Sequence, residues 1–177
     1  MILIINICKE KLHYFEFVKP IEKIISEKDE FFTKSYNEVD ESDLRKADKI
    51  IICGTSLKDN KFLEDIKKFE WIKNYKKPVL GICAGMQIIS LIYGAKLKKE
   101  TEIGFYKEKF VYEFLGISSE KEVYHLHNNY TTLPKDFESF TQSKIPQAIK
   151  HKTREIYGVL FHPEVRNKIV IEKFIQT

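Results

Sequence analysis

Cys83 is the side chain whose setting in the sequence most clearly favours chemistry. It lies in the stretch GICAG, residues 81–85, after the apolar run PVLGIC and before the apolar run AGMQIISLIYG. A strand, a tight turn and a helix in this order form a nucleophile elbow. Glycines flank the nucleophile there because larger side chains would collide with the strand and the helix. The turn exposes the thiol at the carboxyl end of the sheet, where the positive end of the helix dipole favours a thiolate. The N–H of Ala84 would be free to stabilise an oxyanion. The other interpretation is a small core cysteine beside a turn.

A cysteine nucleophile needs a base, and the base needs a group that orients it. His162 is the best candidate among five histidines, because it follows the apolar segment EIYGVLF and opens the turn HPEVRN. Glu164 lies two residues further on, and Pro163 between them stiffens the backbone. A carboxylate so close can hold the imidazole in one tautomer and stabilise the imidazolium. Without Cys83, an ordinary His-Pro at a strand end would be the preferred interpretation.

The elements that must position these side chains alternate in the first half of the chain. Apolar, unalternating strands are expected over residues 1–7, 49–54 and 78–83, with a shorter one over 31–39. Helices are expected over 11–27 with a break or start near Pro20, over 40–48 capped by Asp40 or Ser42, over 57–75, and over 84–94 closed by Gly94. Strands of this kind alternating with helices predict an α/β fold with a doubly wound, mostly parallel sheet flanked by helices.

The second half of the chain has a different pattern. KFVYEFLG and EVYHLHNN are interpreted as shorter strands, QAIKH and EIYGVLFH as a strand pair joined by a charged turn, and VRNKIVIEKFIQ as a closing helix. A chain of 177 residues is long enough for one core and short for two, so residues 1–177 are expected to form a single domain.

Composition excludes several classes of protein. The net charge of +4 is spread along the chain, which favours a solvated surface over nucleic-acid binding. No targeting segment is visible and no apolar run is long enough to span a membrane. Three cysteines without CxxC spacing suggest neither a disulfide framework nor a cysteine-ligated zinc site. We therefore expect a cytoplasmic protein with reduced thiols.

The segment GICAGMQ, followed about eighty residues later by YGVLFHPE, resembles the class I (triad) glutamine amidotransferases. Their pattern is a G-I-C-x-G-x-Q elbow and a late F-H-P-E. The resemblance implies a flavodoxin-like fold in which Cys83 is the nucleophile, His162 the base and Glu164 the orienting acid. It also implies hydrolysis of L-glutamine through a γ-glutamyl thioester, without cofactor or metal. The ammonia would pass to a synthase, and the chain has no room for that second domain, so a separate synthase subunit is the expected partner.

The same resemblance implies the remaining site residues. Gln87, in the first turn of the elbow helix, would help to seat glutamine, as would the backbone around His127 and Asn128. The family's second oxyanion loop reads S-G-G-P, whereas this chain has Cys53-Gly54-Thr55-Ser56. Gly54 is kept and the donor would be the N–H of Thr55, although threonine accepts fewer backbone conformations than glycine. Cys53 is interpreted as a core residue.

Three functions remain open at this point. The segment QAIKHKTREIYGVLFHPEV most resembles amidotransferase subunits of GMP synthase, whose partner would be an ATP-pyrophosphatase-type subunit. A hydrolase of γ-glutamyl amides or peptides would share the same triad. A catalytically impaired binding module is the third possibility, and the altered oxyanion loop is its only support.

Overall fold

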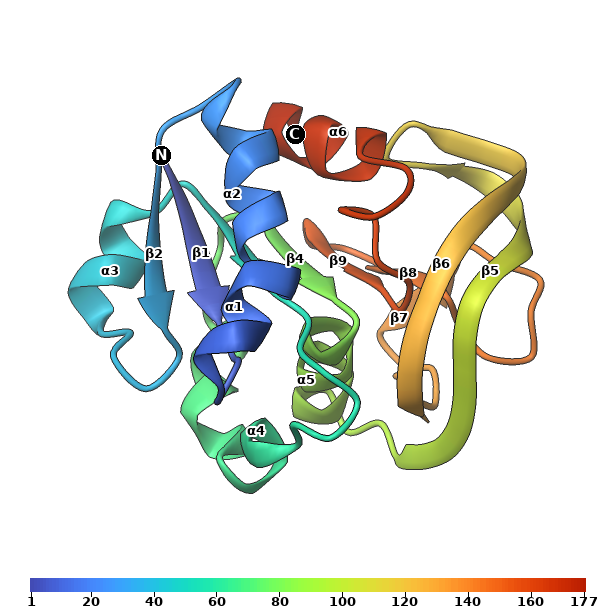
Figure 1. Ribbon diagram of the computed structural model, residues 1–177, viewed down its shortest axis with the longest axis horizontal. Helices are drawn as coiled ribbons and strands as arrows, with labels where there is room; N and C mark the ends of the chain where they lie inside the picture. The colour runs from blue at the N-terminus through green and yellow to red at the C-terminus, as the bar shows by residue number, and fades with distance from the viewer.

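A seven-stranded sheet forms the centre of the protein, whose computed structural model describes residues 1–177. Its strand order is β2-β1-β3-β4-β9-β8-β7 (Figure 1). Neighbours from β2 to β9 run parallel, and β8 and β7 extend the sheet antiparallel. The strands are β1 (Ile2–Asn6), β2 (Phe31–Ser35), β3 (Lys49–Ile52), β4 (Val79–Ile82), β7 (Phe137–Ser139), β8 (Ala148–His151) and β9 (Ile156–Val159).

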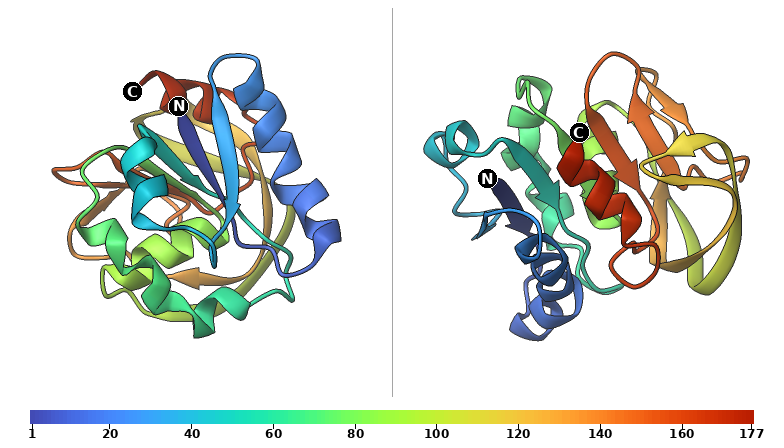
Figure 2. Two further views of the ribbon diagram at one scale, coloured as in Figure 1. Left: turned by 90° about the vertical axis from the view of Figure 1, so that its left-hand side faces the viewer. Right: turned by 90° about the horizontal axis from the view of Figure 1, so that it is seen from above.

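Helices cover both faces of this sheet (Figure 2). They are α1 (Lys11–Phe17), α2 (Lys19–Ser26), α3 (Glu41–Lys46), α4 (Lys61–Glu64), the 3-10 helix η1 (Ile66–Lys73), α5 (Ala84–Ile92) and α6 (Ile169–Gln176). Ile2 and Ile4 of β1 pack on one side with α2 and α6, while Leu3 and Ile5 pack on the other with η1 and α5. Because successive strand residues point to opposite faces, a strand covered on both sides must be apolar throughout. The predicted doubly wound, mostly parallel α/β fold is confirmed.

Three sequence signals for the ends of helices have the predicted effect in the structure. The helical segment after β1 divides at Val18, and Pro20 lies in the first turn of α2, where its missing N–H costs nothing. Asp40 caps α3 by accepting from the N–H of Asp43, whose side chain accepts in return from the N–H of Asp40. Gly94, just past the end of α5, has a φ of +83°.

The helix predicted over residues 57–75 is shorter and of a different kind. Only the four residues of α4 are α-helical, and the longer part is the 3-10 helix η1. Ile66, Phe69 and Ile72 recur every third residue, and this spacing places them on one face of a helix with three residues per turn. Phe69 and Ile72 are fully buried against the sheet.

The largest error of the sequence prediction concerns the segment after α5. Where shorter strands were expected, the chain forms a two-stranded antiparallel ribbon of β5 (Leu97–Phe114) and β6 (Ile117–Thr131), 18 and 15 residues long. Leu115 and Gly116 both have positive φ in the connecting turn, as type I′ hairpin turns require. The ribbon forms a sheet of its own to the side of the central sheet (Figure 1). Its strand β6 contacts Cys83 and His162, which follow the carboxyl ends of β4 and β9. None of the helices is long and apolar enough to cross a bilayer.

Candidate active site

Cys83 lies at the sharp turn between β4 and α5, as predicted. Its φ of 50° and ψ of −105° are strained for a residue with a side chain, and its N–H donates to Val159 O at 2.7 Å. A Cβ on Gly81 would lie 2.5 Å from the backbone of Gly85, and a Cβ on Gly85 would lie 2.2 Å from Ile52 O. Both flanking glycines are therefore required by close backbone approach, which confirms the sequence argument.

His162 and Glu164 lie in the turn that follows β9, and both are almost completely buried. Nδ1 of His162 is 2.7 Å from Oε1 of Glu164. The backbone N–H of His162 donates to Tyr124 O at 2.8 Å, so the turn is fastened to the ribbon strand β6. Pairing of Nδ1 with a carboxylate leaves the other ring nitrogen, Nε2, available for proton transfer.

The electrostatics of His162 follow from its neighbours. Burial lowers the pKa of its imidazole, but the negative charges of Glu164 and Cys83 outweigh burial and raise the pKa well above the usual value. The ring therefore favours the imidazolium beside Cys83. This arrangement suits a nucleophilic sulfur paired with a general acid.

The loop after β3 supplies the opposite wall of the site. Gly54 packs against the catalytic candidates, because a Cβ there would lie 2.8 Å from Cε1 of His162 and 3.4 Å from Cβ of Cys83. Thr55 does not have a positive φ, so its position does not need glycine. Its N–H makes no hydrogen bond within the protein, and its hydroxyl donates to Oδ2 of Asp59 at 2.8 Å. Thr55, which replaces the second glycine of the family's S-G-G-P loop, therefore keeps a free backbone N–H.

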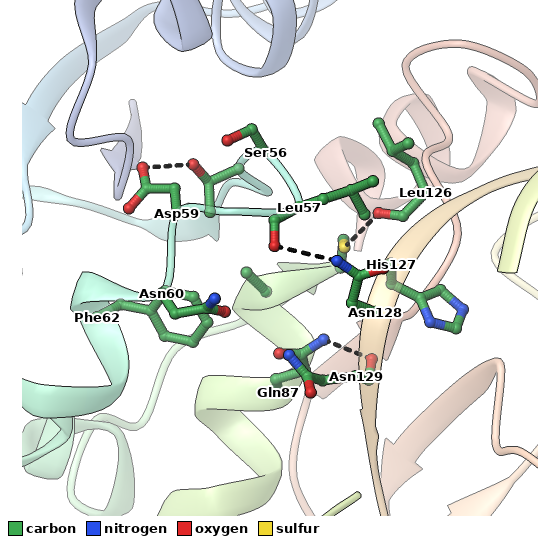
Figure 3. A pocket seen from close by; sticks show the side chains of 13 residues that line it. Ser56, Leu57, Asp59, Asn60, Phe62, Gln87, Leu126, His127, Asn128 and Asn129 are labelled. Carbon is green, nitrogen blue, oxygen red and sulfur yellow. Dashed lines mark hydrogen bonds between the residues drawn. The ribbon is translucent and has the colours of Figure 1, made fainter. Parts of the chain in front are cut away.

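A small pocket opens between this loop, the elbow and β6 (Figure 3). Its lining includes Thr55, Cys83, Ala84, Gln87, Asn128 and the backbone of His127. The thiol of Cys83 donates to Leu126 O at 3.6 Å. The structure thus brings most of the predicted site residues together from four segments that are distant in sequence.

Three predicted substrate contacts have side chains engaged elsewhere. The amide nitrogen of Gln87 donates to Asn129 O at 2.9 Å, which ties α5 to β6, and Asn128 donates weakly to Leu57 O at 3.3 Å. The ring of His127 points away from the pocket (Figure 3). Its Nε2 is 2.9 Å from Oε2 of Glu102 on β5. His127 can therefore contribute to the pocket through its backbone but not through its ring.

Asp59 is a site residue that the sequence reasoning missed. Besides the Thr55 hydroxyl, its Oδ2 accepts the N–H of Lys9 at 2.7 Å, and its own N–H donates to Ser56 O at 3.0 Å. The carboxylate thus joins the loop after β1 to the loop after β3. Its sequence setting, LKDNK, carries no motif that would have indicated this role.

Comparison with known families gives one match over most of the chain. The family profile described as "Glutamine amidotransferase class-I" matches residues 19–175. The glutamine-hydrolyzing A subunit of GMP synthase from Thermoplasma acidophilum is 34% identical over 140 residues, 74% of this chain and 70% of the relative. Its counterpart from Methanobrevibacter smithii is 32% identical over 108 residues, 55% of this chain and only 56% of the relative.

Comparison with solved structures agrees with the sequence comparison. A crystal structure from Thermoplasma acidophilum, provisionally assigned as the A subunit of GMP synthase, superposes with a TM-score of 0.86 and 26% identity. The superposition covers 99% of this chain and 92% of the other. The ribbon as well as the central sheet therefore has a counterpart in that structure.

Proposed function

Because this chain belongs to the class I glutamine amidotransferases, we propose that Cys83, His162 and Glu164 are the residues with which it hydrolyses glutamine. Membership makes the chain an enzyme of glutamine hydrolysis, and the role of each residue is our assignment. The observation that carries the assignment is the convergence of a strained elbow cysteine with a buried His162–Glu164 pair, 2.7 Å between Nδ1 and Oε1.

In the first half-reaction the thiolate of Cys83 attacks the side-chain amide carbon of glutamine. The carbonyl oxygen becomes an oxyanion. We assign its stabilisation to the N–H groups of Thr55 and Ala84, two residues that line the pocket. The imidazolium of His162 then gives its proton to the leaving nitrogen. The carbon–nitrogen bond breaks, ammonia leaves, and a γ-glutamyl thioester remains on Cys83.

In the second half-reaction water attacks the thioester. His162, now neutral, takes a proton from the water, and Glu164 stabilises the imidazolium that forms. Collapse of the tetrahedral intermediate breaks the carbon–sulfur bond and releases glutamate, and the Cys83 thiolate and charged His162 are restored. No step needs a metal or an organic cofactor.

We further propose that the ammonia is delivered to a separate synthase chain, and that the synthase is GMP synthase. Support comes from the names of the relatives, which are GMP synthase subunits, and from the Thermoplasma structure. An ATP-pyrophosphatase-type subunit is the partner we infer. We also infer that residues 1–177 form one domain, since strands from both halves of the chain share one sheet. Three unpaired thiols favour a cytoplasmic location.

The direct test measures glutamate release by the purified chain, alone and with GMP synthase chains that lack their own glutamine site. We expect glutamine hydrolysis that rises when the correct partner is added, together with glutamine-dependent formation of GMP. Cys83→Ala should lose both. Rapid hydrolysis of γ-glutamyl peptides, with free glutamine ignored, would instead favour a γ-glutamyl hydrolase. A correctly folded chain that hydrolyses neither substrate, with or without partner, would identify a binding module.

A further inference from the structure

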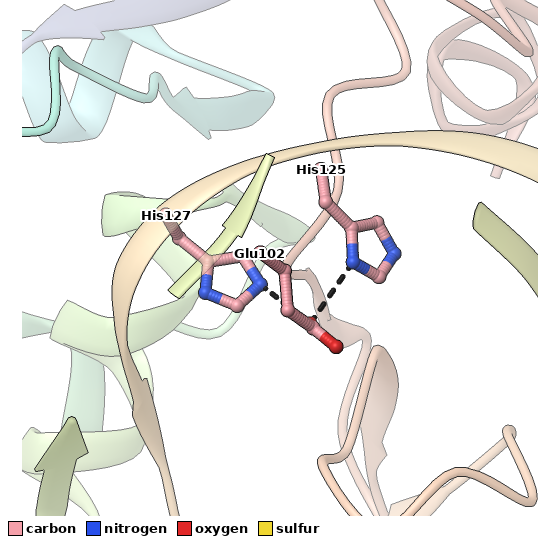
Figure 4. Close-up of side chains that lie close together, drawn as sticks. All are labelled: Glu102, His125 and His127. Carbon is pink, nitrogen blue, oxygen red and sulfur yellow. Dashed lines mark hydrogen bonds and ion pairs between the residues drawn. The ribbon is translucent and has the colours of Figure 1, made fainter. Parts of the chain in front are cut away.

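Two histidines and a glutamate meet on the face of the ribbon that points away from the active-site pocket. His125 and His127 are two residues apart on β6, so their side chains project from the same face. Glu102 on β5 is the cross-strand partner of His127. Its Oε2 lies 2.9 Å from Nδ1 of His125 and 2.9 Å from Nε2 of His127 (Figure 4). One carboxylate oxygen is therefore approached by both rings.

The polar atoms of this cluster are buried and incompletely paired. His125 and His127 are 0% and 2% exposed. Nε2 of His127 makes no hydrogen bond despite its short distance to Oε2 of Glu102, and the amide oxygen of Gln147 has no partner either. The Gln147 amide nitrogen approaches the same glutamate oxygen at 2.8 Å. Buried polar groups left unpaired are costly and need an explanation.

We propose that Glu102, His125 and His127 bind one divalent transition-metal ion of the Zn²⁺ class. Imidazole nitrogens and a carboxylate oxygen are the ligand set that Zn²⁺ and its neighbours prefer. Tetrahedral bonds of 2.0–2.1 Å place ligand atoms about 3.3 Å apart, so each 2.9 Å contact would open by about 0.4 Å. A strand carrying His-x-His with a cross-strand glutamate provides three ligands on rigid elements.

Side chains around the three proposed ligands can hold the His125 ring in a metal-binding orientation. Nε2 of His125 lies 3.7 Å from Oε1 of the buried Glu108, which could orient the ring from outside. Tyr106 stacks on the same ring with centroids 4.6 Å apart. A half-turn of the Gln147 amide would offer its oxygen as a fourth ligand.

The ion would have a structural role beside the active site. Leu126 lies between the two histidines in sequence, and its carbonyl accepts the thiol of Cys83 on the opposite face of β6. An ion shared by β5 and β6 at this point would fix the strand that forms one wall of the pocket. Glutamine hydrolysis itself does not pass through the ion, so the two assignments succeed or fail separately.

The experiment titrates Zn²⁺ into metal-free protein carrying Cys83→Ala, which removes the thiol that lines the active-site pocket as a competing ligand. We expect one equivalent per chain by calorimetry, and the same in Cys83→Ala with His151→Gln, a matched histidine on β8 outside the cluster. Adding His125→Gln or Glu102→Gln should weaken binding more than about 100-fold, since loss of an outer partner alone costs 10- to 100-fold. Adding Glu108→Gln should weaken it within that smaller range.

Co²⁺ provides a readout that does not depend on the cluster variants folding. In the Cys83→Ala chain it should give the visible absorption of a tetrahedral site without sulfur-to-cobalt charge transfer. Binding well below one equivalent, a thiolate spectrum, or full binding in folded His125→Gln would overturn the assignment. The cluster would then be a metal-free hydrogen-bonded network.

Discussion

Gly54→Ala tests whether the space beside His162 is as narrow as the structure requires. The new Cβ would lie 2.8 Å from Cε1 of His162, where ordinary van der Waals contact begins at 3.4 Å, so the ring must move by about 0.6 Å. Gly54 does not have a positive φ, so alanine strains no backbone there. A displacement of 1 Å in a catalytic group costs roughly 100-fold in rate. We therefore expect kcat/KM for glutamine hydrolysis to fall by about 10- to 100-fold, or about 1.4 to 2.7 kcal/mol in the barrier.

The assay is glutamate release under steady-state conditions, with the melting temperature measured on the same preparations. Gly94→Ala is the matched control. A Cβ on Gly94 would meet no other atom, but the φ of +83° at this residue is unfavourable for alanine. Alanine should therefore cost about 1 to 2 kcal/mol of stability and leave kcat/KM unchanged. If Gly54→Ala retains full kcat/KM and full stability, His162 does not occupy the position from which its role was inferred.

Three further predictions concern the supports of the site. Glu164→Gln removes the charge that stabilises the imidazolium of His162, so kcat/KM should fall by about 100- to 10,000-fold. Because the pKa of His162 is raised in the native protein, the alkaline decline of wild-type kcat/KM should begin only as the pH rises through that pKa. In Glu164→Gln this alkaline decline should move to lower pH. An alkaline decline at the same pH in both proteins would contradict this account. Asp59→Ala leaves the Thr55 hydroxyl without its acceptor and should lower kcat/KM roughly tenfold with little loss of melting temperature, whereas unchanged kinetics would exclude a positioning role. Gly85→Ala forces a Cβ to within 2.2 Å of a backbone oxygen and should cost about 3 kcal/mol or more, a fall in melting temperature of roughly 6 to 12 °C by thermal unfolding.

The catalytic residues could be predicted because their signals are local. The glycines around Cys83 are required by contacts that the strand-turn-helix order already implies, and the close spacing of His162 and Glu164 indicated their pairing. What the sequence could not provide was the distance between these two segments. That depends on the parallel pairing of β4 with β9, which places both strand ends at one edge.

The ribbon could not be predicted at its true length because most of its surface is exposed. β5 has only three buried residues among 18, and all three lie in its second half. Apolar alternation therefore appears only near the end of the strand. The orientation of His127 is a consequence of this ribbon, since the face of β6 that meets β5 and Gln147 is defined only once the two strands pair. The His-x-His spacing was visible, but its glutamate lies 23 residues before His125 and carries no motif.

Covalent labelling by a glutamine-analogue electrophile, mapped by mass spectrometry, tests the identity of the nucleophile most directly. The chain has three unpaired cysteines, of which only Cys83 combines a strained elbow with contact to the pocket. We expect one label per chain on the peptide carrying Cys83, protection by excess glutamine, and neither label nor glutamate release in Cys83→Ala. Label on Cys8 or Cys53 with Cys83 unmodified, or glutamate release by Cys83→Ala, would contradict the account.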